Sequence, residues 1–73
     1  MTADTVSPQN KYAEQCVLGS MIRENAVIAD VVQIVRREDF YFAHHQHIFT
    51  AACELDADGK PADMVTIANR LRE

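Results

Sequence analysis

Residues 38–49 read EDFYFAHHQHIF and place three histidines within four positions, directly after an acidic pair and an aromatic run. On a helix His44 and His47 share one face because they are three positions apart, whereas His45 points about 100° away from His44. Zinc takes more protein ligands than two imidazoles can supply. Cys53 lies on no ridge shared with His47, and the chain has no HExxH motif. The spacing therefore favours partner-facing or capping histidines over a metal site.

The stretch continues into a predicted helix from Ala43 to Ala57, and Gly59 is well placed as its left-handed C-terminal stop. The residues expected to point inward along it are Ile48, Phe49, Ala52, Cys53 and Leu55. Asp63 is a strong N-cap for a last helix, whose apolar residues have the i, i+3, i+4, i+7 spacing of an amphipathic face. These residues are Met64, Ile67, Ala68 and Leu71. We expect this helix to be still running, uncapped, at Glu73.

Two helices are predicted before the histidine stretch. Asn10 is a plausible N-cap for the first, along which apolar residues recur near the helical period. They are Ala13, Cys16, Val17, Met21 and Ile22. Asn25 can cap the second, which carries Ile28, Val31, Val32 and Val35. The β-branched residues of this segment also allow a strand, but the chain has no strong hairpin turn, and a lone strand has nothing to pair with.

The fold predicted from these segments is all-α, a small multi-helix orthogonal bundle of about four helices. Residues 1–10 are polar and turn-prone, and we expect them to form a flexible N-terminal tail ahead of a helical domain at 11–73. A chain of 73 residues buries only about 60% of the surface that its unfolded form exposes, so its stability is expected to be marginal.

Composition restricts the class of partner. The net charge is −4 and no Lys/Arg cluster is larger than the pair Arg36-Arg37, so the charge pattern of a stand-alone nucleic-acid binder is missing. A protein or small-molecule partner fits better. The two cysteines, Cys16 and Cys53, lie among apolar residues as small buried hydrophobes do. The first residues do not resemble a signal peptide, and no apolar run approaches the ~20 residues that span a bilayer, so a cytoplasmic protein without membrane contact is expected.

No catalytic or cofactor site is predicted. The segment ELDADGKPADMV, which begins at Glu54, resembles a calcium loop, but Val65 stands where such a loop needs its bidentate Glu. A helix end and a turn rich in Asp and Gly explain the same residues. The chain contains no GxxxxGK[ST], GxGxxG or GxSxG motif. Glu38-Asp39 is an adjacent acidic pair whose side chains diverge, which favours a solvated helix entry over a catalytic dyad.

Three blocks of the chain together resemble one family. The segments AEQCVLGSMI (13–22), EDFYFAHHQHIFTA (38–51) and DGKPADMVTIANRL (58–71) are similar to successive blocks in the N-terminal domain of the bacterial replicative DNA helicase, the DnaB family. The first block matches at Ala13, Glu14, Gln15, Val17, Leu18 and Gly19. The second matches at Asp39, Phe40, Tyr41, His45, Ile48 and Phe49. The third matches at Gly59, Pro61, Asp63, Val65, Thr66 and Leu71. The spacing between blocks also fits, so the similarity covers about residues 8–73.

The resemblance implies that His45 holds the family's usual position and His47 a common variant one, in a packed helix that binds no metal. It implies an all-α head, followed in longer members by a helical hairpin and a motor domain. Heads and hairpins of the family assemble into a collar on the hexamer, which docks primase and in some lineages a helicase loader. Our chain would end inside the head, before its last helices. ATP, magnesium and DNA would then belong to the absent motor domain of an ATP-dependent helicase.

The resemblance thus predicts a domain for self-association and for binding primase or a loader in DNA replication, with no catalytic, cofactor-binding or metal-binding residues. The residues expected to form the fold core are Leu18, Val32, Phe40, Tyr41, His45, Ile48, Phe49, Ile67 and Leu71. Two alternatives remain open at this point. One is a free-standing helical adaptor that binds a host replicative helicase. The other is a metal- or redox-sensing module that uses His44, His47 and Cys53.

Overall fold

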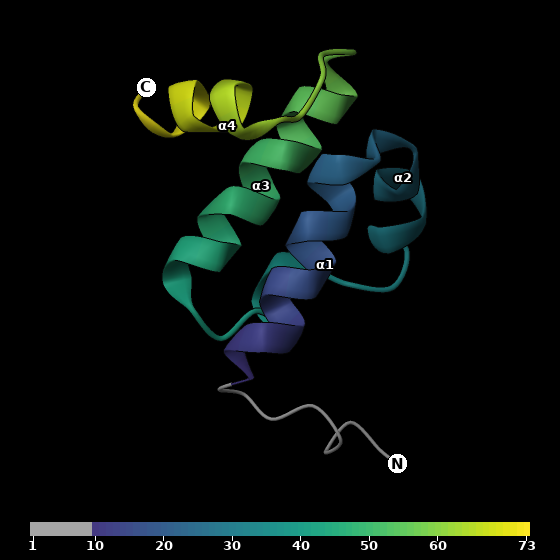
Figure 1. Cartoon of the computed structure of the whole chain (residues 1–73), viewed down its shortest axis with the longest axis vertical. Helices are drawn as coiled ribbons and strands as arrows, with labels where there is room; N and C mark the ends of the chain where they lie inside the picture. The colour runs from purple at the N-terminus through teal and green to yellow at the C-terminus, as the bar shows by residue number, and fades with distance from the viewer. Residues whose placement is uncertain (1–9) are drawn as a thin grey trace.

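The computed structural model of the protein describes residues 10–73, so the predicted flexible tail lies outside the described residues apart from Asn10. The described part is all-helical, in the order α1 (Lys11–Arg23), η2 (Asn25–Val27), α2 (Ile28–Val31), η3 (Arg37–Asp39), α3 (Ala43–Ala57) and α4 (Met64–Leu71). In Figure 1, α1 lies between α3 and α2, and α4 crosses the far end of α3 at a steep angle. The all-α prediction is confirmed within residues 10–73, where four α-helices and no strand are present.

Local contacts explain where α1 and α4 begin and where α3 ends. The Asn10 side chain accepts a hydrogen bond from the Ala13 N–H at 3.0 Å and caps α1. Asp63 and Thr66 cap α4 reciprocally, at 2.9 Å for the Thr66 N–H and 2.8 Å for the Asp63 N–H. Gly59 follows α3 with a φ of 75°, a conformation that glycine adopts without strain. The predicted bounds of α3 are confirmed.

The last helix ends earlier than expected. We expected it to run on through Glu73, but α4 ends at Leu71. The N–H groups of Arg72 and Glu73 donate to carbonyls three residues back, on Asn69 and Arg70, each at 3.2 Å. This tighter turn satisfies two of the carbonyls at the end of the helix.

The second predicted helix is much shorter than its apolar pattern suggested. Only one turn of 3-10 helix and the four residues of α2 form, and the chain after Val31 makes a turn. Asn25 does not cap this helix through its side chain. Its amide instead accepts from the Ala62 N–H at 2.9 Å and donates to the carbonyls of Met21 and Ala62 at 2.8 and 3.0 Å. Asn25 therefore joins the end of α1 to the loop between α3 and α4.

The core lies between α1, α2, α3 and the first half of α4. Its buried apolar residues are Leu18, Met21, Ile28, Phe40, Phe49, Ala51, Ala52, Leu55, Ala62 and Ile67. Of the nine residues expected in the core, Leu18, Phe40, His45, Phe49 and Ile67 are buried. Ile48 is half-buried and packs against the cluster.

Three of the core predictions are wrong. Val32 is 44% exposed because α2 has already ended and the chain turns away there. Tyr41 is 53% exposed because it follows Phe40 in extended backbone, where successive side chains point to opposite sides. Leu71 is 46% exposed because it ends α4, beyond the turn that Ile67 packs into the core.

Candidate protein-interaction surface

A buried contact between a histidine and a glutamate holds the start of α3 against α1. His45 Nδ1 and Glu14 Oε1 are 2.7 Å apart, and both side chains are buried. The other carboxylate oxygen of Glu14 accepts a hydrogen bond from the Tyr41 N–H at 2.7 Å. One glutamate on α1 thus binds the connector before α3 and the first turn of α3 together.

Burial and hydrogen bonding act on Glu14 in opposite directions. Burial raises the pKa of its carboxyl group, because the charged form loses water. The Tyr41 N–H, the His45 ring and the Phe42 N–H all stabilise the carboxylate and outweigh burial, so the pKa lies below its ordinary value of 4.5. Glu14 is therefore ionised in the folded protein at neutral pH.

The sequence identified His45 as a core residue but gave Glu14 no role. A signal was present, because Glu14, Leu18 and Met21 are buried at the i, i+4, i+7 spacing of one helix face. A carboxylate on such a face needs a partner, since an unpaired buried charge is costly. A nearby histidine in a packed helix would have been the candidate to test.

The three residues considered for a metal or redox site do not form a common site in the structure. His44 and His47 are exposed, and Cys53 is half-buried. Within residues 10–73 no group of three His, Cys, Asp or Glu side chains is arranged to hold a metal ion. Burial, followed by the nearby carboxylates of Asp56 and Glu54, raises the pKa of the Cys53 thiol. A thiol shifted this way holds its proton and is a poor nucleophile.

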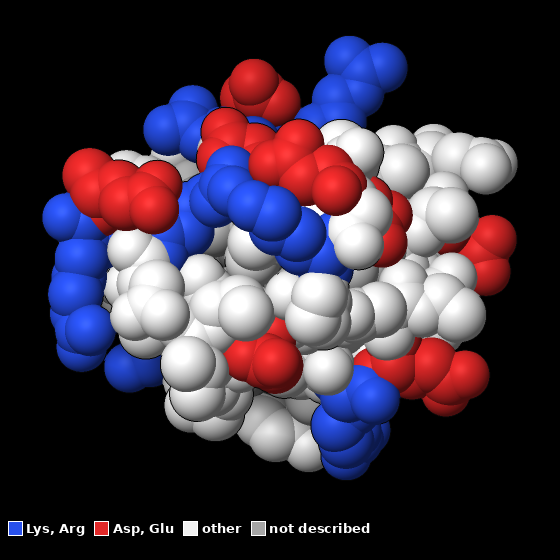
Figure 2. Space-filling model, turned by 90° about the horizontal axis from the view of Figure 1, so that it is seen from above, with Lys and Arg blue, Asp and Glu red and all other residues white. Residues whose placement is uncertain are grey.

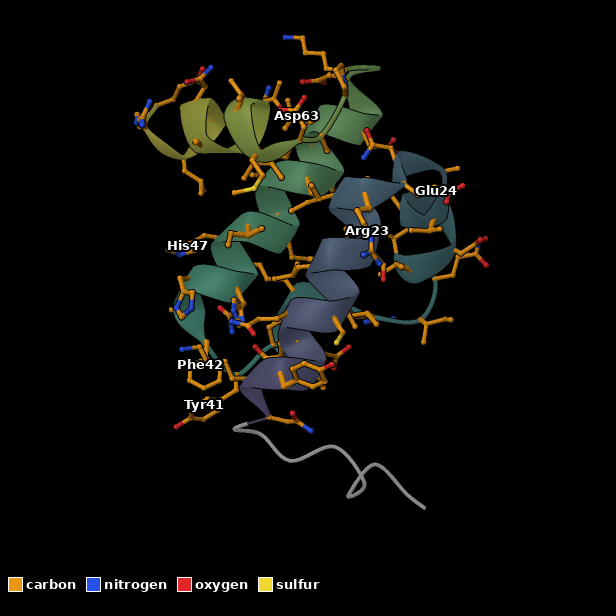
Figure 3. The ribbon with its side chains drawn as sticks, viewed as in Figure 1. Arg23, Glu24, Tyr41, Phe42, His47 and Asp63 are labelled. Atoms are coloured by element: carbon orange, nitrogen blue, oxygen red, sulfur yellow. The ribbon has the colours of Figure 1, made fainter. Side chains whose placement is uncertain are left out.

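The segment that resembles a calcium loop serves as a helix end and an ion-pair site. Arg70 on α4 reaches back to Glu54 Oε1 and Asp58 Oδ2, each at 3.3 Å. Asp63 caps α4, and Figure 3 shows it at the beginning of that helix. The Arg70 contacts hold the last turn of α4 against the end of α3.

The most exposed apolar residues of the C-terminal part lie on α4. Met64 and Val65 are 75% and 68% exposed in its first turn, and Leu71 is 46% exposed in its last. Only Ile67 of the predicted apolar face is buried. The amphipathic pattern is therefore present, but α3 covers only part of it. Exposed apolar residues gathered on one helix mark an association surface.

Charges of both signs lie on the face of the molecule at the α4 end. Figure 2 views the molecule from the α4 end and shows Lys and Arg interleaved with Asp and Glu around an uncharged area. No large area of one sign covers this face, as a phosphate-backbone contact would require. In the described residues no helix is long and apolar enough to cross a membrane. An uncharged area with a rim of mixed charge is typical of protein–protein contacts.

Comparison with known proteins gives a consistent set of relatives. Residues 6–73 match the family described as DnaB-like helicase N terminal domain. The chain is 45% identical over 64 residues to a replicative DNA helicase DnaB of Mycobacterium leprae (strain TN), covering 88% of the chain and 11% of the relative. It is 38% identical over 69 residues to the same protein of Geobacillus stearothermophilus, covering 94% of the chain and 15% of the relative.

A solved structure agrees with the sequence relatives. The crystal structure of the N-terminal domain of DnaB helicase from Mycobacterium tuberculosis superposes with a TM-score of 0.84 at 43% identity. The match covers 92% of this chain and 46% of that chain. The chain therefore spans about half of a solved N-terminal domain and a small part of the curated relatives.

Proposed function

Because the chain belongs to the DnaB-like helicase N-terminal domain family, we propose that its work in DNA replication is to bind other proteins, with no chemistry of its own. The single observation that carries this proposal is the exposed apolar part of α4, formed by Met64, Val65 and Leu71. Side chains of this kind lose water favourably when another protein covers them, at roughly 25 cal/mol per Å² of apolar area. Charges of both signs at the α4 end of the molecule (Figure 2) can set the orientation of the partner.

Three kinds of partner fit this surface and the family. The first is a second copy of the chain, as in a hexameric collar. The others are the replicative primase and, in some lineages, a helicase loader. Self-association is supported by the small net charge of −4, since repulsion of that size does not prevent contact between copies.

Catalysis is assigned to other parts of the longer relatives. The 73 residues contain no phosphate-binding loop, so we place ATP, magnesium and the contact with DNA in a motor domain outside this chain. The bundle then needs no cofactor and works in the cytoplasm, where replication proteins meet DNA.

Self-association through α4 is expected to depend on concentration. Sedimentation velocity over about a hundredfold concentration range should show the weight-average sedimentation coefficient rising, because mass action favours the associated form. Leu71→Glu should shift the rise to higher concentration, since the new carboxylate must lose water when the apolar surface is covered.

Val32→Glu is the matched control. Val32 is also apolar and is 44% exposed, compared with 46% for Leu71, but it lies beside α2 rather than on α4. This variant should associate as the native chain does. A monomer at every concentration, or the same loss of association in both variants, would contradict self-association through α4.

A further inference from the structure

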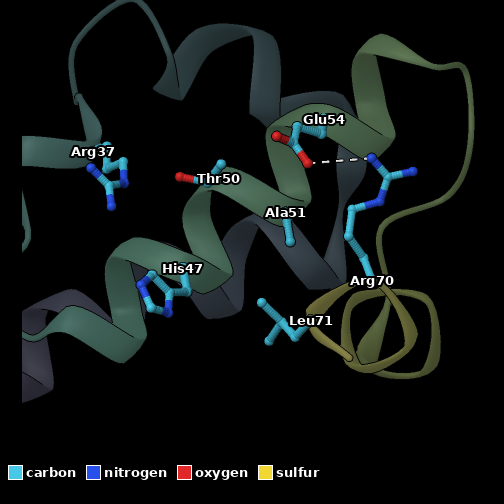
Figure 4. Close-up of a pocket in the computed structure, with 7 residues that line it drawn as sticks. All are labelled: Arg37, His47, Thr50, Ala51, Glu54, Arg70 and Leu71. Carbon is cyan, nitrogen blue, oxygen red and sulfur yellow. Dashed lines mark hydrogen bonds and ion pairs between the residues drawn. The ribbon is translucent and has the colours of Figure 1, made fainter. Parts of the chain in front are cut away.

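We propose that the groove between α3 and α4 binds an extended segment of a partner protein that carries a carboxylate next to an apolar side chain. The inference rests on the proposed function and names one docking site and the chemistry of its ligand. Figure 4 shows the groove, with Arg37 and His47 at one end and Arg70 at the other. Its volume is about 220 Å³.

The end of the groove near Arg37 is cationic. Arg37 belongs to η3 and is exposed, and none of the ion pairs found within residues 10–73 includes it. The His47 imidazole and the Thr50 hydroxyl line the same end and add hydrogen-bonding groups. A guanidinium group recognises a carboxylate through two parallel N–H donors. In a chain with a net charge of −4, this end is a site for an acidic side chain.

The middle of the groove is apolar, and the arginine at its other end is already paired with carboxylates. Ala51 forms the floor, and the half-exposed Leu71 forms a wall. Arg70 bounds the far end but is paired with Glu54 and Asp58 at 3.3 Å each. A ligand therefore meets one cation outside these ion pairs, then an apolar surface, then a cluster of one guanidinium and two carboxylates whose net charge is negative.

The size of the groove fits side chains of a peptide. Pockets that hold drug-sized ligands measure roughly 300–1,000 Å³, so a groove of about 220 Å³ is small for a free cofactor. One carboxylate side chain and one apolar side chain would fill it, with the peptide backbone left at the open surface. The Glu54 carboxylate lines the groove away from Arg37 and would repel a phosphate backbone, which carries charge along its whole length, whereas a single carboxylate can lie at the Arg37 end. A peptide is therefore favoured over a nucleic acid.

The test uses a fluorescein-labelled peptide of aspartate, leucine and glycine, and a second peptide with lysine in place of every aspartate. Fluorescence anisotropy should show saturable binding of the acidic peptide to the chain and none of the basic one. Arg37→Glu should weaken binding about tenfold, because it replaces one attraction with a repulsion. Circular dichroism should show that this exposed substitution leaves the fold intact.

Arg23→Glu is the matched control for charge. It changes the net charge equally, but Figure 3 shows Arg23 on α1, away from His47 at the outer edge of α3. It should weaken peptide binding by less than about twofold, since exposed charges beyond a Debye length are screened. No saturable binding, or equal weakening by both variants, would overturn the proposal.

Two further outcomes would also overturn the choice of occupant. An oligothymidylate of equal charge that displaces the acidic peptide would make the groove a phosphate site. Loss of self-association in Arg37→Glu would make the occupant a second copy of the chain. Absence of peptide binding in a chain that still self-associates through α4 would remove the groove proposal alone and leave the proposed function standing.

Discussion

Phe49→Ala is expected to abolish the cooperative unfolding transition of the chain. Phe49 is 5% exposed, and its ring lies 5.1 Å from that of Phe40 at an interplanar angle of 41°. Truncating a buried phenylalanine costs about 3–5 kcal/mol, and a core of this size supplies little more than that in total. Thermal denaturation followed by circular dichroism should show no sigmoidal transition for the variant.

Tyr41→Ala separates the effect of burial from the loss of an aromatic ring. Tyr41 lies in the connector before α3 and is 53% exposed, with its ring against that of Phe42 at a centroid distance of 5.1 Å. Its replacement should cost about 1 kcal/mol or less, the value typical of surface aromatic pairs, and should leave a clear transition. A cooperative transition retained in Phe49→Ala would show that the ring is not essential to the core.

Glu14→Ala is expected to destabilise the chain nearly as much as loss of the Phe49 ring. The substitution leaves the part-buried Tyr41 N–H and the buried His45 ring without their acceptor. Leaving a buried donor without its acceptor costs about 1–3 kcal/mol per group, and two groups lose their acceptor here. Urea denaturation at neutral pH should show the loss, while Glu24→Ala, which removes an exposed carboxylate at the end of α1, should change the midpoint little.

Acid should weaken the hydrogen bonds that the Glu14 carboxylate accepts. The pKa of Glu14 is lowered on folding, so its contribution to stability is complete above the ordinary value of 4.5 and is lost as the pH falls through the lower, folded value. Glu14→Gln should remove much of this acid-dependent loss. Part of the acid-dependent loss of stability will remain, because a hydrogen bond from the Thr66 N–H also lowers the pKa of Asp63. An unchanged pH profile in Glu14→Gln would contradict the role given to the carboxylate.

Features set by neighbouring residues could be predicted from the sequence. The Asn10 and Asp63 caps, the stop at Gly59 and the full length of α3 depend on groups within a few positions of each other. Apolar spacing was a weaker guide at Val32, because a helical pattern can be present where too few hydrogen bonds form to continue the helix. The prediction of the family came from the three blocks that resemble the DnaB family.

Contacts between distant residues could not be predicted this way. The Glu14–His45 pair joins residues 31 positions apart, and the Asn25–Ala62 pair joins residues 37 apart. Polar side chains of these kinds are also common at helix surfaces and caps, so only the packed bundle shows which of them are buried. The groove likewise exists only because η3, α3 and α4 meet, and no spacing in the sequence groups Arg37 with Leu71.

Binding to the primase of the same organism is the most direct test of the central claim that this chain is a protein-binding domain of a replicative helicase. Isothermal titration of the primase into the chain should give a saturable heat, because covering the exposed apolar side chains of α4 removes them from water. Leu71→Glu or Arg37→Glu should reduce the affinity, and Arg23→Glu should not. A primase that binds the full-length helicase but gives no heat with this chain would contradict the claim.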